Sequence, residues 1–207
     1  MAIQLPKASE DLFYPLELAY ATAKIPNYWE RKNTGAGKTM WLGIGNRRNY
    51  GVGESRNNDK FPDIMREARV LITQLCPTLN WTALQVNINY EADWHTDKNN
   101  DGKSMVVAFG DYEGGELETE DGTVYDLRHR PVVFEAAKVR HRVRPVTRGT
   151  RYSIVFFRPR FPKAFQELYG ALTYSQLEGL LPPREGGQPA SEIRMDYQMG
   201  HKTAKLE

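Results

Sequence analysis

Residues 82–90, TALQVNINY, open a series of short β-rich runs that decides the fold of this chain. Each run is rich in β-branched and aromatic residues, and Gly, Asn, Asp or Pro separates one run from the next. Strands of this number and spacing indicate a sandwich or a barrel rather than a doubly wound sheet. The sequence therefore predicts a mainly β fold with flanking helices, with strands at 82–90, 103–110, 115–120, 123–127, 131–136, 138–146 and 150–157.

The segments before this β-rich part predict two helices and a long loop. Residues 9–25 have apolar residues at helical spacing, with an interruption or a start near Pro15. Residues 62–75 form an amphipathic pattern with proline in the first turn. Residues 33–59 are rich in Gly, Asn and Arg, which predicts a loop with at most one short strand at 39–44.

The C-terminal part predicts two short helices and a polar tail. The helical patterns cover 163–172 and 173–181, and residues 182–207 are polar and rich in Gly and Pro. The expected organisation is a single domain over 1–181. Its parts are helices and a loop at 1–81, a β core at 82–160 and helices at 161–181, before the flexible tail.

Composition excludes several classes of protein. The chain has 207 residues, 40% hydrophobic and 26% charged, which is ordinary for a globular protein. Cys76 is the single cysteine, so an intrachain disulfide is impossible. We find no apolar run long enough to span a membrane and no signal-peptide core, so we expect no membrane partner and no disulfide partner. We therefore expect an intracellular location, cytoplasmic, or nuclear in a eukaryote.

The net charge of +2 hides two segments of opposite charge. Residues 111–126 contain seven acidic residues and no Lys or Arg, whereas 128–160 contain ten Lys or Arg and one acid, Glu135. A basic block of this size attracts polyanions. The same pattern also arises when an acidic strand and a basic strand pair across one sheet. Both interpretations remain open from the sequence.

His95 and Asp97 stand two residues apart in the segment NYEADWHTDKNNDG (89–102). An extended backbone projects both side chains to one side. Period-two alternation in 138–146 places His141 on the apolar inner face and Arg140, Arg142 and Arg144 on the outer face. Two imidazoles and a carboxylate form the facial triad of non-haem Fe(II) sites, and zinc accepts the same ligands.

The remaining histidines are weaker candidates. His129 lies between two arginines and is expected to be exposed, while His201 lies in the tail.

Arg151 supplies a further signal, because alternation in 150–157 turns Arg151 and Ser153 inward within an apolar strand. A buried guanidinium requires an anionic partner. That partner is either a carboxylate of the protein or the distal carboxylate of a dicarboxylate co-substrate.

Together, His95, Asp97, His141, Arg151 and Ser153 resemble the site of the Fe(II) and 2-oxoglutarate dependent oxygenases. The resemblance covers residues 82–160 and implies a double-stranded β-helix (jelly-roll) core. It also implies that His95, Asp97 and His141 are the catalytic, iron-binding residues, and that Arg151 and Ser153 bind 2-oxoglutarate. Tyr90 is either a further contact of this co-substrate or a core tyrosine.

The segments RRNYGVGESRNN (47–58) and HTDKNNDGKSMVVAFGDYEGGEL (95–117) resemble the branch of TET and J-binding-protein oxygenases, with their phage and algal relatives. That resemblance implies oxidation of a pyrimidine 5-methyl group in DNA, with 5-methylcytosine favoured over thymine. The base must be flipped out of the duplex. The expected substrate contacts are Asn100 at the base and Asn46, Arg47, Arg48 and Arg56 in the loop, with Arg140, Arg142 and Arg144 at phosphates.

Two other interpretations remain. The loop at 33–59 could instead be a lid over the co-substrate, in an oxygenase that hydroxylates a protein side chain or a small metabolite. A polyanion-binding domain without activity is the third possibility, but such a domain has no use for a buried set of metal ligands.

Overall fold

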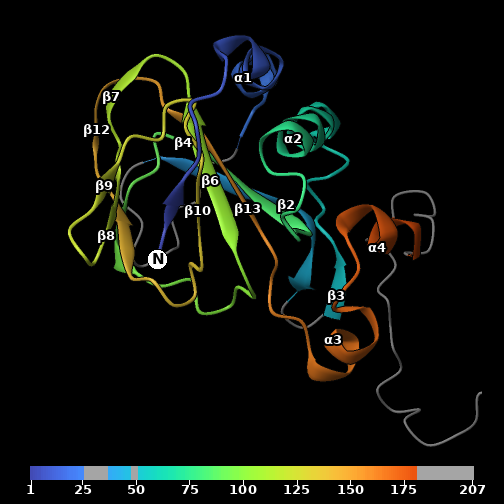
Figure 1. Ribbon diagram of the computed structural model, residues 1–207. Helices are drawn as coiled ribbons and strands as arrows, with labels where there is room; N and C mark the ends of the chain where they lie inside the picture. The colour runs from blue at the N-terminus through green and yellow to red at the C-terminus, as the bar shows by residue number, and fades with distance from the viewer. Residues whose placement is uncertain (26–36, 48–50, 181–207) are drawn as a thin grey trace, which may run out of the picture.

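In the computed structural model, the chain is described over residues 1–25, 37–47 and 51–180, with the side chain of Arg47 excluded. Two sheets face each other, and neighbouring strands run antiparallel (Figure 1). The predicted tail at 182–207, with His201, lies outside the described residues. In the described ranges, none of the helices is long and apolar enough to cross a membrane.

The large sheet carries one wall of the site. Its strands follow the order β1 (Ile3–Gln4), β10 (Val132–Phe134), β6 (Ser104–Phe109), β13 (Tyr152–Phe157), β4 (Ala83–Ile88), β2 (Lys38–Arg47) and β3 (Gly51–Glu54).

The opposite wall is a smaller sheet of four strands, joined by a two-stranded ribbon. The smaller sheet has the order β5 (Ala92–His95), β11 (His141–Val143), β8 (Leu117–Thr119) and β9 (Val124–Tyr125), and the ribbon pairs β12 (Val146–Gly149) with β7 (Tyr112–Gly114). This mainly β architecture of two facing sheets, with helices at the side, is the jelly-roll arrangement that the sequence predicted.

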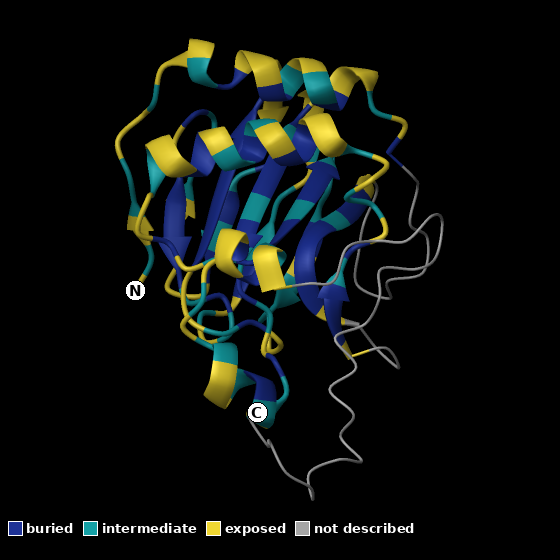
Figure 2. Cartoon of the chain, turned by 90° about the vertical axis from the view of Figure 1, so that its right-hand side faces the viewer, coloured by how far each residue is buried: buried dark blue, intermediate teal, exposed yellow. Residues whose placement is uncertain are grey.

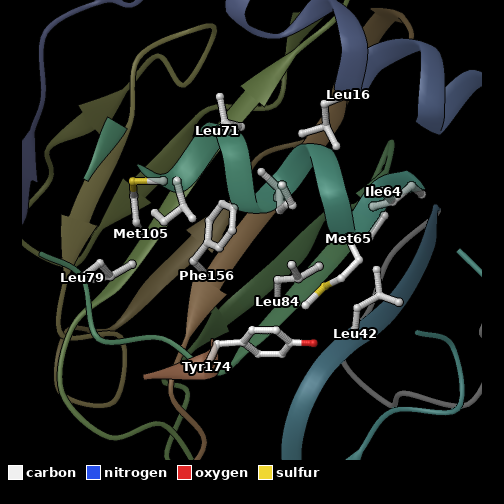
Figure 3. Close-up of a cluster of buried hydrophobic side chains, with 14 of the residues drawn as sticks. Leu16, Leu42, Ile64, Met65, Leu71, Leu79, Leu84, Met105, Phe156 and Tyr174 are labelled. Carbon is white, nitrogen blue, oxygen red and sulfur yellow. The ribbon is translucent and has the colours of Figure 1, made fainter. Parts of the chain in front are cut away.

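Helices cover the outer face of the large sheet (Figure 2). A 3-10 turn, η1 (Glu10–Leu12), leads into α1 (Tyr14–Thr22), and α2 (Pro62–Leu75) packs beside α1. Figure 3 shows part of the resulting core, to which α1 contributes Leu16, α2 contributes Leu71 and β13 contributes Phe156. Two short helices, α3 (Lys163–Tyr169) and α4 (Tyr174–Leu180), follow β13.

Alternation along β4, β6 and β13 explains how one sheet serves both a core and a site. Leu84, Phe109 and Phe156 lie in the core beneath the helices. The alternate residues face the smaller sheet, where Val106 and Ala108 join a second apolar cluster. Burial on both faces accounts for the continuous apolar run of β6.

The short strand predicted at 39–44 is confirmed, but the loop predicted for the rest of 33–59 was wrong where further residues form strands. Residues 38–47 form β2, which pairs with β4, and 51–54 form β3. Glycine favours a loop in the sequence pattern, but Gly43 lies within a strand, where neighbouring backbone leaves no room for a side chain. A Cβ on Gly43, whose φ is +97°, would lie 2.4 Å from the carbonyl oxygen of Thr82.

The expected exposure of His129 was also wrong. The side chain is buried, and its ring lies 4.8 Å from the ring of Phe13, centroid to centroid. Its φ of +56° turns the ring inward between its two arginine neighbours, and burial lowers the pKa of the imidazole.

Candidate active site

His95 and His141 lie directly opposite each other on the paired strands β5 and β11. Their ring centroids are 4.4 Å apart, and the edge of the Phe134 ring supports His141 at 4.9 Å. Cross-strand pairing therefore brings together two imidazoles that are far apart in the sequence.

Each imidazole is held by the backbone carbonyl group of the residue two positions before it. His95 Nδ1 lies 2.7 Å from the carbonyl oxygen of Asp93, and His141 Nδ1 lies 2.9 Å from that of Val139. A carbonyl oxygen only accepts, so each Nδ1 carries the proton and each Nε2 is left with its lone pair. Burial lowers the pKa of His141, which favours the neutral form that binds metals.

Asp97 completes the group from the turn after β5. Its backbone N–H donates to the carbonyl oxygen of Ala136 at 2.9 Å, and its Oδ1 lies 3.6 Å from His95 Nε2. One ligand atom from each of His95, Asp97 and His141 lies within 4.8 Å of the other two. Two imidazole nitrogens and one carboxylate oxygen on one side of a site form a donor set that fits Fe(II).

A pocket of about 440 Å³ opens beside these three residues and runs between the two sheets. Its wall is lined by Arg151, which directly precedes β13, and by Ser153, Val155 and Phe157 of β13, as the period-two alternation predicted. The volume lies in the lower part of the range for small-molecule sites, about 300–1,000 Å³.

Arg151 lies at the buried end of this pocket, with only 1% of its surface exposed. Its Nη1 donates to Ser153 Oγ at 3.0 Å, while its Nε has no hydrogen-bond partner among the described residues. Within those residues, no carboxylate lies within ion-pair distance of the guanidinium. Burial lowers the pKa of Arg151, so an anionic ligand here would relieve an unfavourable state.

Gly115 makes room for the Arg151 side chain, a role that sequence reasoning missed. A Cβ on Gly115 would lie 2.5 Å from Arg151 Cδ, and the φ of Gly115 is +71°. The Gly-Gly pair at 114–115 signalled a turn, but only the packing of two separate strands reveals why a side chain is excluded.

Polar side chains on β4 were missed as well. Gln85 and Asn87 line the pocket, opposite the core residues Leu84 and Val86. The alternation in LQVN carried this signal.

The other predicted site residues lie at different distances from the pocket. Tyr90 lines it from just beyond β4. Asn100 also lines it, with its amide Nδ2 3.4 Å from Asp97 Oδ2 and 3.3 Å from Ser104 Oγ. Asn46, on β2, and Arg56, after β3, are exposed and do not line the pocket, while Arg48 lies outside the described residues.

The basic and acidic segments meet across the smaller sheet and the ribbon. Arg142 lies directly opposite Glu118, and both Arg142 and Arg144 form ion pairs with this carboxylate, at 2.6 and 2.9 Å. Arg148 pairs with Glu113 at 2.8 Å. These contacts correspond to the paired-strand interpretation of the charge pattern, and they neutralise part of the predicted phosphate-binding face.

Comparison with known proteins connects this site to a family. Residues 82–158 match the 2OG-Fe(II) oxygenase superfamily. The structure of NgTET1 in complex with 5mC DNA is similar, with 15% identity, a TM-score of 0.53, and coverage of 83% of this chain and 80% of that chain.

Two further solved structures are similar to the chain. An oxidoreductase of the 2OG-Fe(II) oxygenase family from Burkholderia pseudomallei has 17% identity and a TM-score of 0.53, covering 77% of this chain and 85% of that one. A Pseudomonas putida prolyl-4-hydroxylase has 19% identity and a TM-score of 0.46, covering 77% and 92%. No curated protein matches the chain.

Proposed function

We propose that this chain is a dioxygenase that uses Fe(II) and 2-oxoglutarate, and that it oxidises the 5-methyl group of 5-methylcytosine in DNA; the match of residues 82–158 to the 2OG-Fe(II) oxygenase superfamily supports the reaction type. The expected product is 5-hydroxymethylcytosine, with further oxidation as an extension of the same reaction. One observation carries the assignment of the site. The three candidate metal ligands line the same pocket as a buried arginine that has no carboxylate within ion-pair distance among the described residues.

In this proposal, His95, Asp97 and His141 hold the iron through two nitrogens and one oxygen. Arg151 and Ser153 bind the distal carboxylate of 2-oxoglutarate, and Tyr90 lines the same space. When bound, Fe(II) and 2-oxoglutarate supply the oxidising power that inserts oxygen from O₂ into a C–H bond. The protein positions both groups and encloses the reacting atoms between its sheets.

The choice of DNA rests on the resemblance of residues 47–58 and 95–117 to the TET and J-binding-protein branch. The pocket, of about 440 Å³, has the size of a small-molecule site, and an oxygenase that acts on one base must take that base out of the duplex. Lys98 adds a cation to the lining of the pocket, where a phosphate beside the flipped base could pass.

A second candidate is hydroxylation of a protein side chain or a small metabolite. The ion pairs of Arg142, Arg144 and Arg148 favour it, because they leave fewer cations available to a polyanion.

Nucleoside mass spectrometry separates the two candidates. The protein is incubated with Fe(II), 2-oxoglutarate and DNA that contains 5-methylcytosine or thymine, and succinate is followed in parallel. A new hydroxymethyl, formyl or carboxyl pyrimidine is the expected result, and it identifies the base. Succinate formation with unmodified DNA would reject the DNA substrate, keep the oxygenase, and direct the search to peptides and metabolites.

A further inference from the structure

A row of polar side chains on β2 and β4 leads along the large sheet to Ser153 of β13. Thr39 lies directly opposite Asn87 in the pairing of β2 with β4, and Asn87 lies opposite Ser153 in the pairing of β4 with β13. Thr39, Asn87 and Ser153 are buried, and Gln85 stands two positions before Asn87 on the same face. Buried polar groups in such a row must satisfy one another.

The hydrogen bonds in this row run in one direction. Gln85 Nε2 donates to Thr39 Oγ1, and Thr39 Oγ1 donates to Asn87 Oδ1 at 2.7 Å. Asn87 Nδ2 then donates to Ser153 Oγ at 3.4 Å. An amide nitrogen only donates, so the Thr39 hydroxyl sends its own proton on to Asn87, whose NH₂ is thereby turned towards Ser153.

Ser153 Oγ therefore accepts twice, once from Asn87 and once from Arg151 Nη1 at 3.0 Å. A hydroxyl oxygen has two lone pairs, and both are used. Among the described residues, no acceptor receives the Ser153 proton, and Ser153 lines the pocket. The hydroxyl must then donate into the pocket, so the end formed by Arg151 and Ser153 offers only donors.

We propose that Gln85, Thr39 and Asn87 are positioning residues that fix the Ser153 hydroxyl as a donor to the distal carboxylate of 2-oxoglutarate. The inference rests on one part of the proposed function, the binding of this carboxylate by Arg151 and Ser153. It does not depend on which substrate is oxidised. Because the row fixes the Ser153 hydroxyl as a donor, the site favours a co-substrate whose distal group accepts hydrogen bonds. A co-substrate with an apolar distal group would leave the donors unpaired.

The test compares two ligands on the full chain loaded with Mn(II), without O₂ and without DNA. Titration calorimetry measures the Kd of 2-oxoglutarate and of 2-oxopentanoate, which has a methyl group in place of the distal carboxylate. Thr39→Val keeps the shape of the side chain and removes the hydroxyl. We expect it to weaken 2-oxoglutarate about tenfold, the usual scale for a residue that orients a ligand-binding group, and to leave 2-oxopentanoate unchanged.

Two other variants guard against a general effect on folding. Thr39→Ser should restore the affinity for 2-oxoglutarate. Thr82→Val removes another buried threonine hydroxyl, which donates to the carbonyl oxygen of Ile44 away from the pocket, and should leave both affinities unchanged. If Thr39→Val does not fold, Gln85→Leu tests the partly buried end of the row. This variant should also weaken the binding of 2-oxoglutarate, but by less than Thr39→Val.

Equal weakening of both ligands, or no weakening of either, would overturn the inference. Because DNA is absent, failure of DNA oxidation leaves this result untouched. Conversely, if the wild type oxidises DNA but Thr39→Val binds 2-oxoglutarate as tightly as the wild type, only the positioning role is rejected.

Discussion

Gly115 and Arg151 approach so closely that a single methyl group cannot be placed between them. A Cβ on Gly115 would lie 2.5 Å from Arg151 Cδ and 2.9 Å from Arg151 Nε. A glycine directly after β7 thus limits the position of an arginine directly before β13.

Gly115→Ala should therefore displace Arg151 and weaken 2-oxoglutarate binding by about tenfold or more, since a shift of about 1 Å in a positioned group is costly. The backbone conformation itself adds about 1–3 kcal/mol of strain. Gly122→Ala is the matched control, because its φ of +83° imposes similar strain while no atom lies within 4 Å of the added Cβ. Equal co-substrate affinity in the two variants would show that the contact with Arg151 does not matter.

Asp97→Ala should abolish turnover and leave the affinity for DNA near that of the wild type, because the carboxylate serves the metal and not the duplex. Mn(II) binding measured by calorimetry should be lost in parallel. Asp63→Ala, which alters an exposed carboxylate of α2, is the control and should change neither property. Loss of DNA affinity in Asp97→Ala would mean that the metal centre is structural.

Asn100 has two candidate roles that one experiment distinguishes. Its amide lies against Asp97 Oδ2, which leaves Oδ1 towards His95 and the metal position. If it orients this carboxylate, Asn100→Ala should lower metal affinity about 10- to 100-fold. If it contacts the target base instead, metal affinity should persist while the KM for 5-methylcytosine DNA rises.

Glu118→Gln should release Arg142 and Arg144 from their shared carboxylate. If DNA passes over this face, the affinity of the protein for DNA should rise at low salt. The slope of log K against log salt should become steeper by about one to two, because one or two more cations contact phosphates. Filter binding of one duplex across a salt series measures the slope. Glu113→Gln releases Arg148 on the neighbouring ribbon, and comparing the two variants shows whether the change in slope is specific to Arg142 and Arg144. An unchanged slope in both variants would place the DNA elsewhere.

His129 should make the stability depend on pH. Burial lowers its pKa in the folded state, so below about pH 6.5 the unfolded chain binds more protons than the folded one. Stability should fall as the pH drops through this range. His129→Asn, which tolerates the positive φ and does not titrate, should reduce the slope of unfolding free energy against pH between about 5 and 7. Urea denaturation at several pH values measures it, and an undiminished slope would assign the effect to other groups.

The β core could be predicted from the sequence because its strands are short, are bounded by turn residues and alternate regularly between apolar and polar residues. The alternation in 150–157 placed Arg151 and Ser153 on the pocket face, and that in 82–90 could have placed Gln85 and Asn87 there too. The amphipathic helix at 62–75 agrees with α2 at both ends, since its apolar face packs on the large sheet.

Features that depend on contacts between distant segments could not be predicted in the same way. Gly43 of β2 packs against the backbone at Thr82, and this contact is not visible in the sequence, where glycine favours a loop. His129 is buried because α1 places Phe13 beside it. The pairing of Arg142 and Arg144 with one carboxylate depended on the register of β8 against β11, which the charge pattern left open.

The opposed positions of His95 and His141 have a consequence for the stability of the whole core. The two residues are neighbours in space but 46 positions apart in the sequence, and strands β6 to β10 lie between them. An ion that joins them acts as a removable crosslink that closes this long stretch of chain. Chelation of the metal should then destabilise the smaller sheet, where β5 and β11 are paired, so that loss of the ion should shorten the lifetime of the folded chain as well as stop its reaction.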